Sequence, residues 1–191
     1  MFPMNPHSLA LDAADLTLVV IDMQERLTAA MEFKIREQAV ANARRLLALA
    51  NELNLPTVVT EQYPKGLGPT LAEIAAELPD GVTPLPKTVF SCCGEPAFEA
   101  AVKATGRKTL VVFGIETHVC VMQTVVDLLA EGYRVFVPQD ACGSRTQANW
   151  RIGLNLMDRA GAVISSTETV IFQVLKAAGT PAFKAMQPWV K

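Results

Sequence analysis

The sequence predicts an α/β fold: a three-layer αβα sandwich around a mostly parallel, doubly wound sheet of six strands. Two observations support this prediction. Short apolar runs alternate along the chain with longer segments whose apolar residues recur at helical spacing, and the helical segments of the second half end at glycine. Strands and helices that alternate in this way form a parallel sheet covered by helices on both faces.

The expected strands are residues 16–22, 55–60, 81–88, 108–114, 133–138 and 162–165. The expected helices between and after them are residues 33–53, 69–78, 95–106, 119–132, 146–161 and 165–179. The third strand carries Pro84 and Pro86, which suit only an edge strand or an irregular segment. Ser165 followed by Glu168 resembles a capping box that would begin the last helix.

Composition favours one globular domain spanning residues 1–191, since half of the residues are hydrophobic and no low-complexity linker divides the chain. The net charge of −2 gives no electrostatic reason to expect nucleic acid or a membrane surface as partner, so a small molecule is expected. No secretory signal, transit peptide or membrane-spanning run is visible, which favours the cytoplasm. The four cysteines should then be free thiols.

Three side chains follow strand ends, where parallel sheets of this class carry their functional groups. Asp22 ends the first strand, Lys87 ends the third, and Cys120 follows the fourth in the segment "VVFGIETHVCVMQTV". In the common strand order the first and fourth strands are neighbours, so Asp22 and Cys120 can meet at the point where the order reverses. Lys87 would need its long side chain and an inward loop to reach them.

These residue types suit nucleophilic catalysis. A helix N-terminus and a nearby cation should lower the pKa of the Cys120 thiol, and the partly desolvated Asp22 should act as its base while Lys87 holds the carboxylate. His118 is an improbable partner, because helical residues two apart point to different sides. Each residue also has a plainer interpretation: Asp22 as a helix cap, Lys87 as a solvated cation, and Cys120 as a small buried hydrophobe.

The motifs "VVIDMQ", "PKTVFS" and "GIETHVCVMQT" together resemble the isochorismatase-like cysteine hydrolase superfamily, and "EQYPKGLGPT" is similar to its isochorismatase domain-containing branch. The resemblance covers nearly the whole chain. It implies a catalytic triad of Asp22, Lys87 and Cys120, and a cis peptide between Ile115 and Glu116. It also implies an oxyanion hole formed by the backbone N–H groups of Glu116 and Cys120, and assembly into dimers or larger homo-oligomers.

The reaction implied by the resemblance is hydrolysis of a small amide or related acyl compound through an acyl-enzyme on Cys120. Nicotinamidase-like members hold a metal with an Asp-x-His pair after the second strand, where this chain has "VVTEQYPKG" and only Glu61 as a ligand type. No metal and no cofactor are therefore expected. The candidate substrate-binding residues are Gln24, Tyr63, Phe90 and Thr117.

Three alternatives stay open at this point. The chain could be a non-catalytic binding or scaffold protein on a hydrolase fold. It could also hydrolyse a vinyl ether, a reaction for which relatives use the Asp and do not need the Cys. Finally, the adjacent Cys92 and Cys93 could form a thiol sensor, although ordinary packing near the mouth of the site is the simpler interpretation of both.

Overall fold

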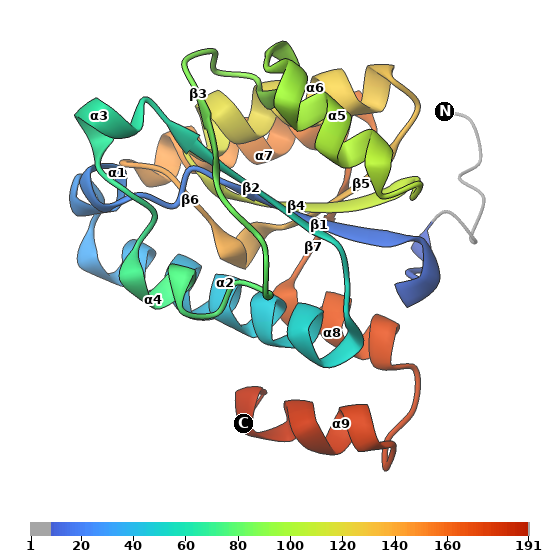
Figure 1. Cartoon of the computed structure of the whole chain (residues 1–191). Helices are drawn as coiled ribbons and strands as arrows, with labels where there is room; N and C mark the ends of the chain where they lie inside the picture. Colours follow the sequence, from blue (N-terminus) through green and yellow to red (C-terminus); the bar gives the residue numbers. More distant parts are fainter. Residues whose placement is uncertain (1–8, 191) are drawn as a thin grey trace.

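A computed structural model describes residues 9–190 as a parallel sheet between two helical layers (Figure 1). The strand order is β3-β2-β1-β4-β5-β7, with β6 paired beside the end of β4. The strands are β1 Leu16–Ile21, β2 Thr57–Gln62, β3 Leu85–Lys87, β4 Thr109–Ile115, β5 Arg134–Pro138, β6 Cys142–Gly143 and β7 Val163–Ser165. The predicted α/β class and parallel sheet are confirmed. All six predicted strands are present, and the seventh, β6, has only two residues and leaves no periodic pattern.

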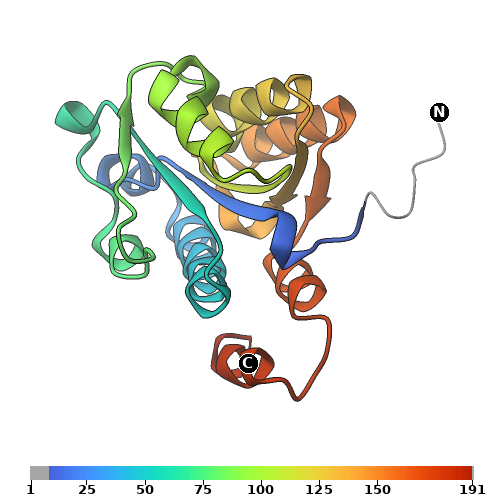
Figure 2. The ribbon, with the colours of Figure 1, turned by 45° about the vertical axis from the view of Figure 1, so that its right-hand side comes forward.

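Helices cover both faces of the sheet, with α5, α6 and α7 on one side and α2, α4 and α8 on the other (Figures 1 and 2). The helices are α1 Glu25–Ala29, α2 Phe33–Leu53, α3 Pro64–Leu67, α4 Ala72–Ala75, α5 Pro96–Ala104, α6 Met122–Ala130, α7 Gln147–Ala160, α8 Thr167–Leu175 and α9 Pro181–Met186. The short helices α1, α3 and α9 were not predicted, because four to six residues are too few to establish a helical period.

Two details of the predicted helices are wrong. The residues predicted to open a helix at 119 begin with a π-helical turn, Thr117–Val121, which then continues into α6. The cap of α8 is Ser166, whose hydroxyl accepts a hydrogen bond from the Thr169 N–H at 3.2 Å. A Ser165 cap would require Ser165 to lie outside β7, which it ends.

The core lies between the sheet and its helices. Every residue of β1 and β4 is buried, as expected for central strands covered on both faces. Phe98, Phe113 and Phe136 are the largest side chains with almost no exposed surface. β3 lies at the sheet edge, where Pro84 and Pro86 are tolerated.

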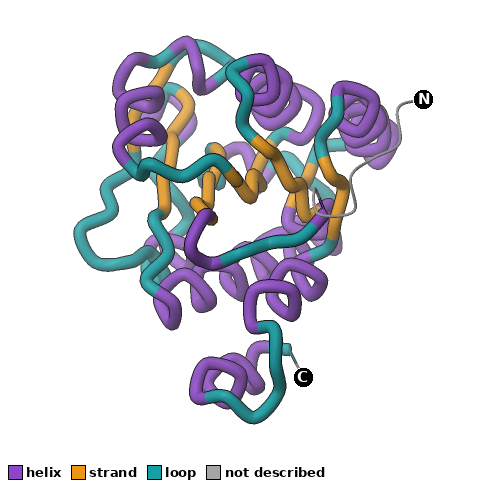
Figure 3. Tube along the Cα trace, turned by 90° about the vertical axis from the view of Figure 1, so that its right-hand side faces the viewer, coloured by secondary structure: helices purple, strands orange, loops and turns teal. Residues whose placement is uncertain are grey.

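The C-terminal helix α9 lies outside α2 and α8, away from the sheet (Figures 1 and 3). It is held by buried Met186 and by Arg45, whose Nε donates to the Trp189 carbonyl at 2.7 Å. Within residues 9–190, no helix combines the length and the hydropathy needed to cross a bilayer.

Candidate active site

The ends of β1 and β4 lie in direct contact, which brings the exits of these strands together. β1 pairs in parallel with β4, and Ile21 lies opposite Gly114. Gly114 has a φ of 130°, and a Cβ placed there would lie 2.1 Å from the Ile21 carbonyl oxygen. Only glycine allows the two backbones to approach this closely. Asp22 therefore follows β1 beside the peptide bond between Ile115 and Glu116, which is cis.

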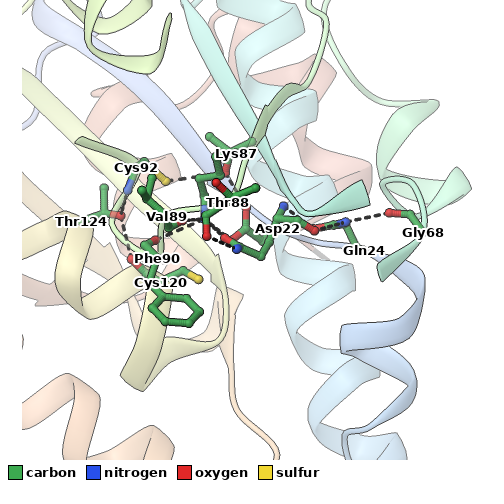
Figure 4. A network of polar contacts seen from close by, with 12 residues as sticks. Asp22, Gln24, Gly68, Lys87, Thr88, Val89, Phe90, Cys92, Cys120 and Thr124 are labelled. Atoms are coloured by element: carbon green, nitrogen blue, oxygen red, sulfur yellow. Dashed lines mark hydrogen bonds and ion pairs between the residues drawn. The ribbon is translucent and has the colours of Figure 1, made fainter. Parts of the chain in front are cut away.

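Asp22 is completely buried and adopts a left-handed φ of 51°, an uncommon conformation for a residue other than glycine. Its Oδ1 accepts a hydrogen bond from the Thr60 hydroxyl at 2.7 Å, and its Oδ2 lies 2.7 Å from Lys87 Nζ. The interpretation of Asp22 as a helix cap is wrong, because α1 begins after Gln24 without a side-chain cap. The carboxylate instead lies inside a polar cluster (Figure 4).

Lys87 reaches Asp22 from the edge of the sheet and has almost no exposed surface. Its Nζ donates to Asp22 Oδ2 and to Gln62 Oε1 at 2.6 Å, and it lies 3.2 Å from each of the Val89 and Phe90 carbonyl oxygens. Burial lowers the pKa of Lys87, but the charge of Asp22 and the neighbouring thiols outweigh it, and the net pKa is raised. Lys87 is thus a buried ammonium ion and not a solvated loop cation.

Cys120 lies in the π-helical turn and is 5 % exposed. Burial raises its pKa to about 12, and the charge of Asp22 and a hydrogen bond with that carboxylate also raise it, whereas Lys87 lowers it. The expectation of a lowered pKa is therefore wrong, because desolvation and the nearby carboxylate outweigh the ammonium ion. At neutral pH the resting thiol is therefore protonated, and the Asp22 carboxylate is near enough for its charge to act on it.

The side chains of Glu116, Thr117 and His118, which precede Cys120 in the sequence, differ in their hydrogen-bond partners. The Glu116 carboxylate pairs with the Arg145 guanidinium, with Oε1 and Nε 3.0 Å apart. His118 Nδ1 lies 3.1 Å from Ser144 Oγ. The His118 ring therefore has Ser144 as a hydrogen-bond partner, which agrees with the expectation that it is not the base for Cys120. Thr117 is fully buried, and its hydroxyl has no hydrogen-bond partner within the described part of the chain.

The other predicted substrate-binding residues differ in what they offer. Both donors of the Gln24 carboxamide are used inside the protein, on the Gln62 carbonyl at 3.0 Å and the Gly68 carbonyl at 2.7 Å. Gln24 therefore joins the strand exits to the loop after α3. Tyr63 and Phe90 are each more than half exposed. A cleft of about 310 Å³ adjoins Lys87 and is lined by Tyr63, Pro64, Lys65, Pro86, Lys87, Thr88 and Glu95.

Four buried residues of the cluster were missed as contributors by sequence reasoning: Thr60, Gln62, Cys92 and Thr124. Thr60 and Gln62 lie in β2 and contact Asp22 and Lys87 directly. Their place near the end of a strand beside β1 was the available signal. Cys92 is fully buried and does not lie at the mouth of the site. Burial raises the pKa of its thiol to about 11; the charge of Lys87 lowers this pKa, and the charge of Asp22 raises it.

Glu61, the one ligand type at the position where nicotinamidase-like proteins bind metal, is used internally. Its Oε1 accepts hydrogen bonds from the N–H of Thr70 at 2.6 Å and from the Thr70 hydroxyl at 2.7 Å. Among residues 9–190, no three His, Cys, Asp or Glu side chains gather closely enough to hold a metal ion.

A parallel α/β sandwich with a buried carboxylate, ammonium ion and thiol at the exits of its strands defines a hydrolase fold of the isochorismatase type. Residues 17–169 match the family described as the isochorismatase domain. The chain belongs to this family. Isochorismatase domain-containing protein 2 of Bos taurus is 40 % identical over 175 residues, which are 91 % of this chain and 82 % of that protein.

Solved structures of similar fold extend the comparison. MAR1 ribonuclease from Caenorhabditis elegans has a TM-score of 0.88 and 34 % identity, and the match covers 95 % of this chain and 92 % of that one. YcaC from Pseudomonas aeruginosa, solved with covalent acrylamide, has a TM-score of 0.88 and 27 % identity over 95 % and 91 % of the two chains. YcaC from Escherichia coli, described as an octameric hydrolase of unknown specificity, has a TM-score of 0.87 and 27 % identity over 97 % and 94 %.

Proposed function

We propose that the protein is a metal-independent cysteine hydrolase that acts on the amide or a related acyl bond of a small molecule, with Asp22, Lys87 and Cys120 as its catalytic triad. The observation that carries the proposal is the buried Asp22 carboxylate, which Lys87 and Thr60 hold in place near enough to Cys120 for its charge to raise the pKa of that thiol. A protonated thiol beside a fixed base is the arrangement that nucleophilic catalysis by cysteine needs.

In the proposed reaction, Asp22 removes the Cys120 proton as the sulfur attacks the carbonyl carbon of the substrate. The carbonyl oxygen takes the developing charge, and the backbone N–H groups of Glu116 and Cys120 donate to it. When the C–N bond breaks, the protonated Asp22 returns its proton to the leaving amine, and a thioester remains on Cys120. Asp22 then deprotonates a water molecule that attacks the thioester, and the carboxylic acid and the free thiol are released.

Further residues support this assignment. Lys87 stays charged throughout and compensates the carboxylate, since its ammonium donates to Asp22 and Gln62 and lies beside two backbone carbonyls. The exposed rings of Tyr63 and Phe90 supply apolar walls for a substrate. Thr117, which has no exposed surface, has no role in substrate binding in this proposal. Gln24 acts as a positioning residue in this proposal. The reaction as proposed requires no cofactor.

The alternatives have weaker support. Vinyl-ether hydrolysis would leave the thiol beside Asp22 without a role, and a pure binding protein would not need a desolvated ion pair at that place. The C. elegans relative is named a ribonuclease, but the net charge of −2 gives this chain no general attraction for an RNA backbone. We therefore propose a small molecule, and not nucleic acid, as the substrate, and a reducing cytoplasm as the compartment suited to its free thiols.

Two measurements test the proposal. A panel of small amides and esters should give turnover with the wild-type protein and none above background with Cys120→Ala, while Cys93→Ala keeps the activity. Without a known substrate, acrylamide alkylation followed by peptide mass spectrometry reports on the thiol, because the relative from P. aeruginosa carries covalent acrylamide. Cys120 should be the first residue modified. Turnover that survives Cys120→Ala, or acrylamide confined to Cys93, would reject the covalent mechanism.

We also propose that the protein forms a homo-oligomer. The E. coli relative is described as octameric. In this chain α7 exposes Ile152 and Leu156, one turn apart, and the adjacent α6 exposes Val126, so this outer face offers apolar side chains to a second copy. Sedimentation should give a mass above 20.6 kDa, and Ile152→Lys combined with Leu156→Lys should reduce it. A monomeric wild-type protein would contradict the proposal.

A further inference from the structure

Cys92 lies between the proposed base and the segment that carries the proposed nucleophile, although the reaction does not use it. Its side chain has no exposed surface, and its Sγ lies 3.7 Å from Thr60 Oγ1. Its backbone N–H donates to Thr124 Oγ1 at 2.9 Å. Figure 4 shows Cys92 beside Thr124, with Lys87 and Asp22 on the other side. One buried residue therefore contacts two threonines that lead to different parts of the site.

The direction of the first connection follows from the hydrogen-bonding capacity of each group. The Asp22 carboxylate, paired with an ammonium ion, can only accept, so the single hydroxyl proton of Thr60 is donated to Asp22 Oδ1 at 2.7 Å. Thr60 Oγ1 then has only lone pairs to offer to Cys92. The thiol must be the donor, and the chain of hydrogen bonds runs from Cys92 S–H to Thr60 O–H to Asp22.

The second connection is fixed in the same way. The Thr124 hydroxyl donates its proton to the Cys120 carbonyl oxygen at 2.7 Å and accepts the Cys92 N–H with a lone pair. The chain of hydrogen bonds here runs from Cys92 N–H to Thr124 O–H to the backbone of Cys120. All three side chains are buried, so water does not compete for these bonds.

We propose that Cys92 is a positioning residue that fixes the distance and orientation between the Asp22 carboxylate and the Cys120 thiol, through Thr60 on one side and Thr124 on the other. This inference rests on the proposed cysteine mechanism. Cys92 acts as a neutral hydrogen-bond donor and never as a nucleophile. The raised pKa of its thiol, about 11, agrees with a group that keeps its proton at physiological pH.

The test compares second-order rate constants for acrylamide alkylation of Cys120 at pH 8, with the modified residue identified by peptide mass spectrometry. Cys92→Ala removes the donor and should slow the reaction about threefold, whereas Cys92→Ser keeps a donor and should stay within about twofold of wild type. Thr60→Val removes the hydrogen bond to the carboxylate and should slow it about tenfold, with Thr60→Ser as the matched control. Because Cys92 acts through Thr60, the double variant should react no more slowly than Thr60→Val alone.

The Thr124 connection is tested separately, because no substitution of Cys92 removes its backbone N–H. Thr124→Val has nearly the same shape but leaves the Cys92 N–H and the Cys120 carbonyl without this partner, and it should slow alkylation, while Thr124→Ser should restore the rate. The pH dependence of each rate constant, recorded from pH 7 to 10, should shift with Thr60→Val and return with Thr60→Ser. A variant that only loosens the packing would lower the melting temperature without this reversal.

The outcomes separate the inference from the function on which it rests. If acrylamide does not modify Cys120 in the wild-type protein, the cysteine mechanism itself fails. If Cys120 is modified, but Cys92→Ala and Cys92→Ser react at equal rates, or the losses from Thr60→Val and Cys92→Ala multiply, the positioning role of Cys92 is refuted. Should Cys92→Ala not fold, Cys92→Val, which also lacks a hydrogen-bond donor, replaces it in the comparison with Cys92→Ser and in the double variant with Thr60→Val.

Discussion

Lys87 Nζ lies 2.7 Å from Asp22 Oδ2, although the strand that ends at Lys87 is separated from β1 by the whole width of β2. Neither side chain has exposed surface. The Lys87 side chain therefore extends past the end of β2. Two residues of β2 contact the pair there: Thr60 contacts Asp22, and Gln62 contacts Lys87. A desolvated pair of this kind is costly to break from one side, because the remaining charge stays buried without a partner.

Replacing only one member of the pair should thus destabilise the protein more than replacing both. Lys87→Met is expected to lower the free energy of unfolding by about 3 kcal/mol, and the double variant Asp22→Asn/Lys87→Met should recover much of the loss. Urea denaturation at pH 7.5 measures both. Lys103→Met, at an exposed pair with Glu99, is the control and should change stability little. Equal stability of the single and double variants would contradict a desolvated ion pair.

The backbone of α7 supports the π-helical turn that carries Cys120. A Cβ at Gly153 would lie 2.8 Å from the Thr117 carbonyl oxygen and 2.9 Å from His118 Cα. Gly153→Ala should therefore displace the turn and lower the free energy of unfolding by about 2 kcal/mol, although alanine usually favours a helix. Asn155→Ala, on the exposed face of the same helix, should leave it unchanged or slightly higher. Thermal unfolding measures the difference, and a stabilised Gly153→Ala would overturn the assignment.

Much of the fold was predictable because its strongest determinants are local. The runs 16–22 and 108–114 are mostly apolar, which is typical of central strands, and the strands β1 and β4 that they form are buried throughout. The strand order then located Asp22 and Cys120 at neighbouring exits. The sequence did not predict α1, α3 and α9, because helices this short show no helical period. It did not predict β6 either, because this two-residue strand exists only where the folded chain passes beside the end of β4.

The chemistry of the site was harder to predict, because it depends on distances that no pattern contains. The pKa of Cys120 was expected to fall beside a helix start and Lys87, yet burial and Asp22 raise it to about 12. The balance of these opposing effects depends on depth and separation. In the same way, Thr60 and Gln62 are ordinary polar residues in the sequence of β2, and only their contacts with Asp22 and Lys87 reveal their part in the site.

The charge near Lys87 should control the ionisation of Cys120. Gln62 Oε1 lies 2.6 Å from Lys87 Nζ, and Gln62→Glu keeps this shape while adding a negative charge. A negative neighbour disfavours the thiolate, so the pKa of Cys120 should rise further, and the pH profile of its acrylamide alkylation should move about one unit toward higher pH. Gln38→Glu, on the exposed surface of α2, is the control and should leave the profile unchanged. A shift toward lower pH would disprove the electrostatic argument.

Buried thiols should also make the fold sensitive to alkali. The pKa of Cys142 is raised by burial to about 12 from its ordinary value of 9.0, and Cys92 and Cys120 are raised as well. Above pH 9 the unfolded chain loses these protons while the folded protein keeps them, so stability is retained below pH 9 and falls as pH rises, by about 1.4 kcal/mol per pH unit for each fully buried thiol. Urea denaturation at pH 8, 9 and 10 measures this slope. Cys142→Ala should make the slope shallower by the share of one thiol, whatever its own effect on stability at pH 8. An unchanged slope would show that Cys142 ionises equally well in both states.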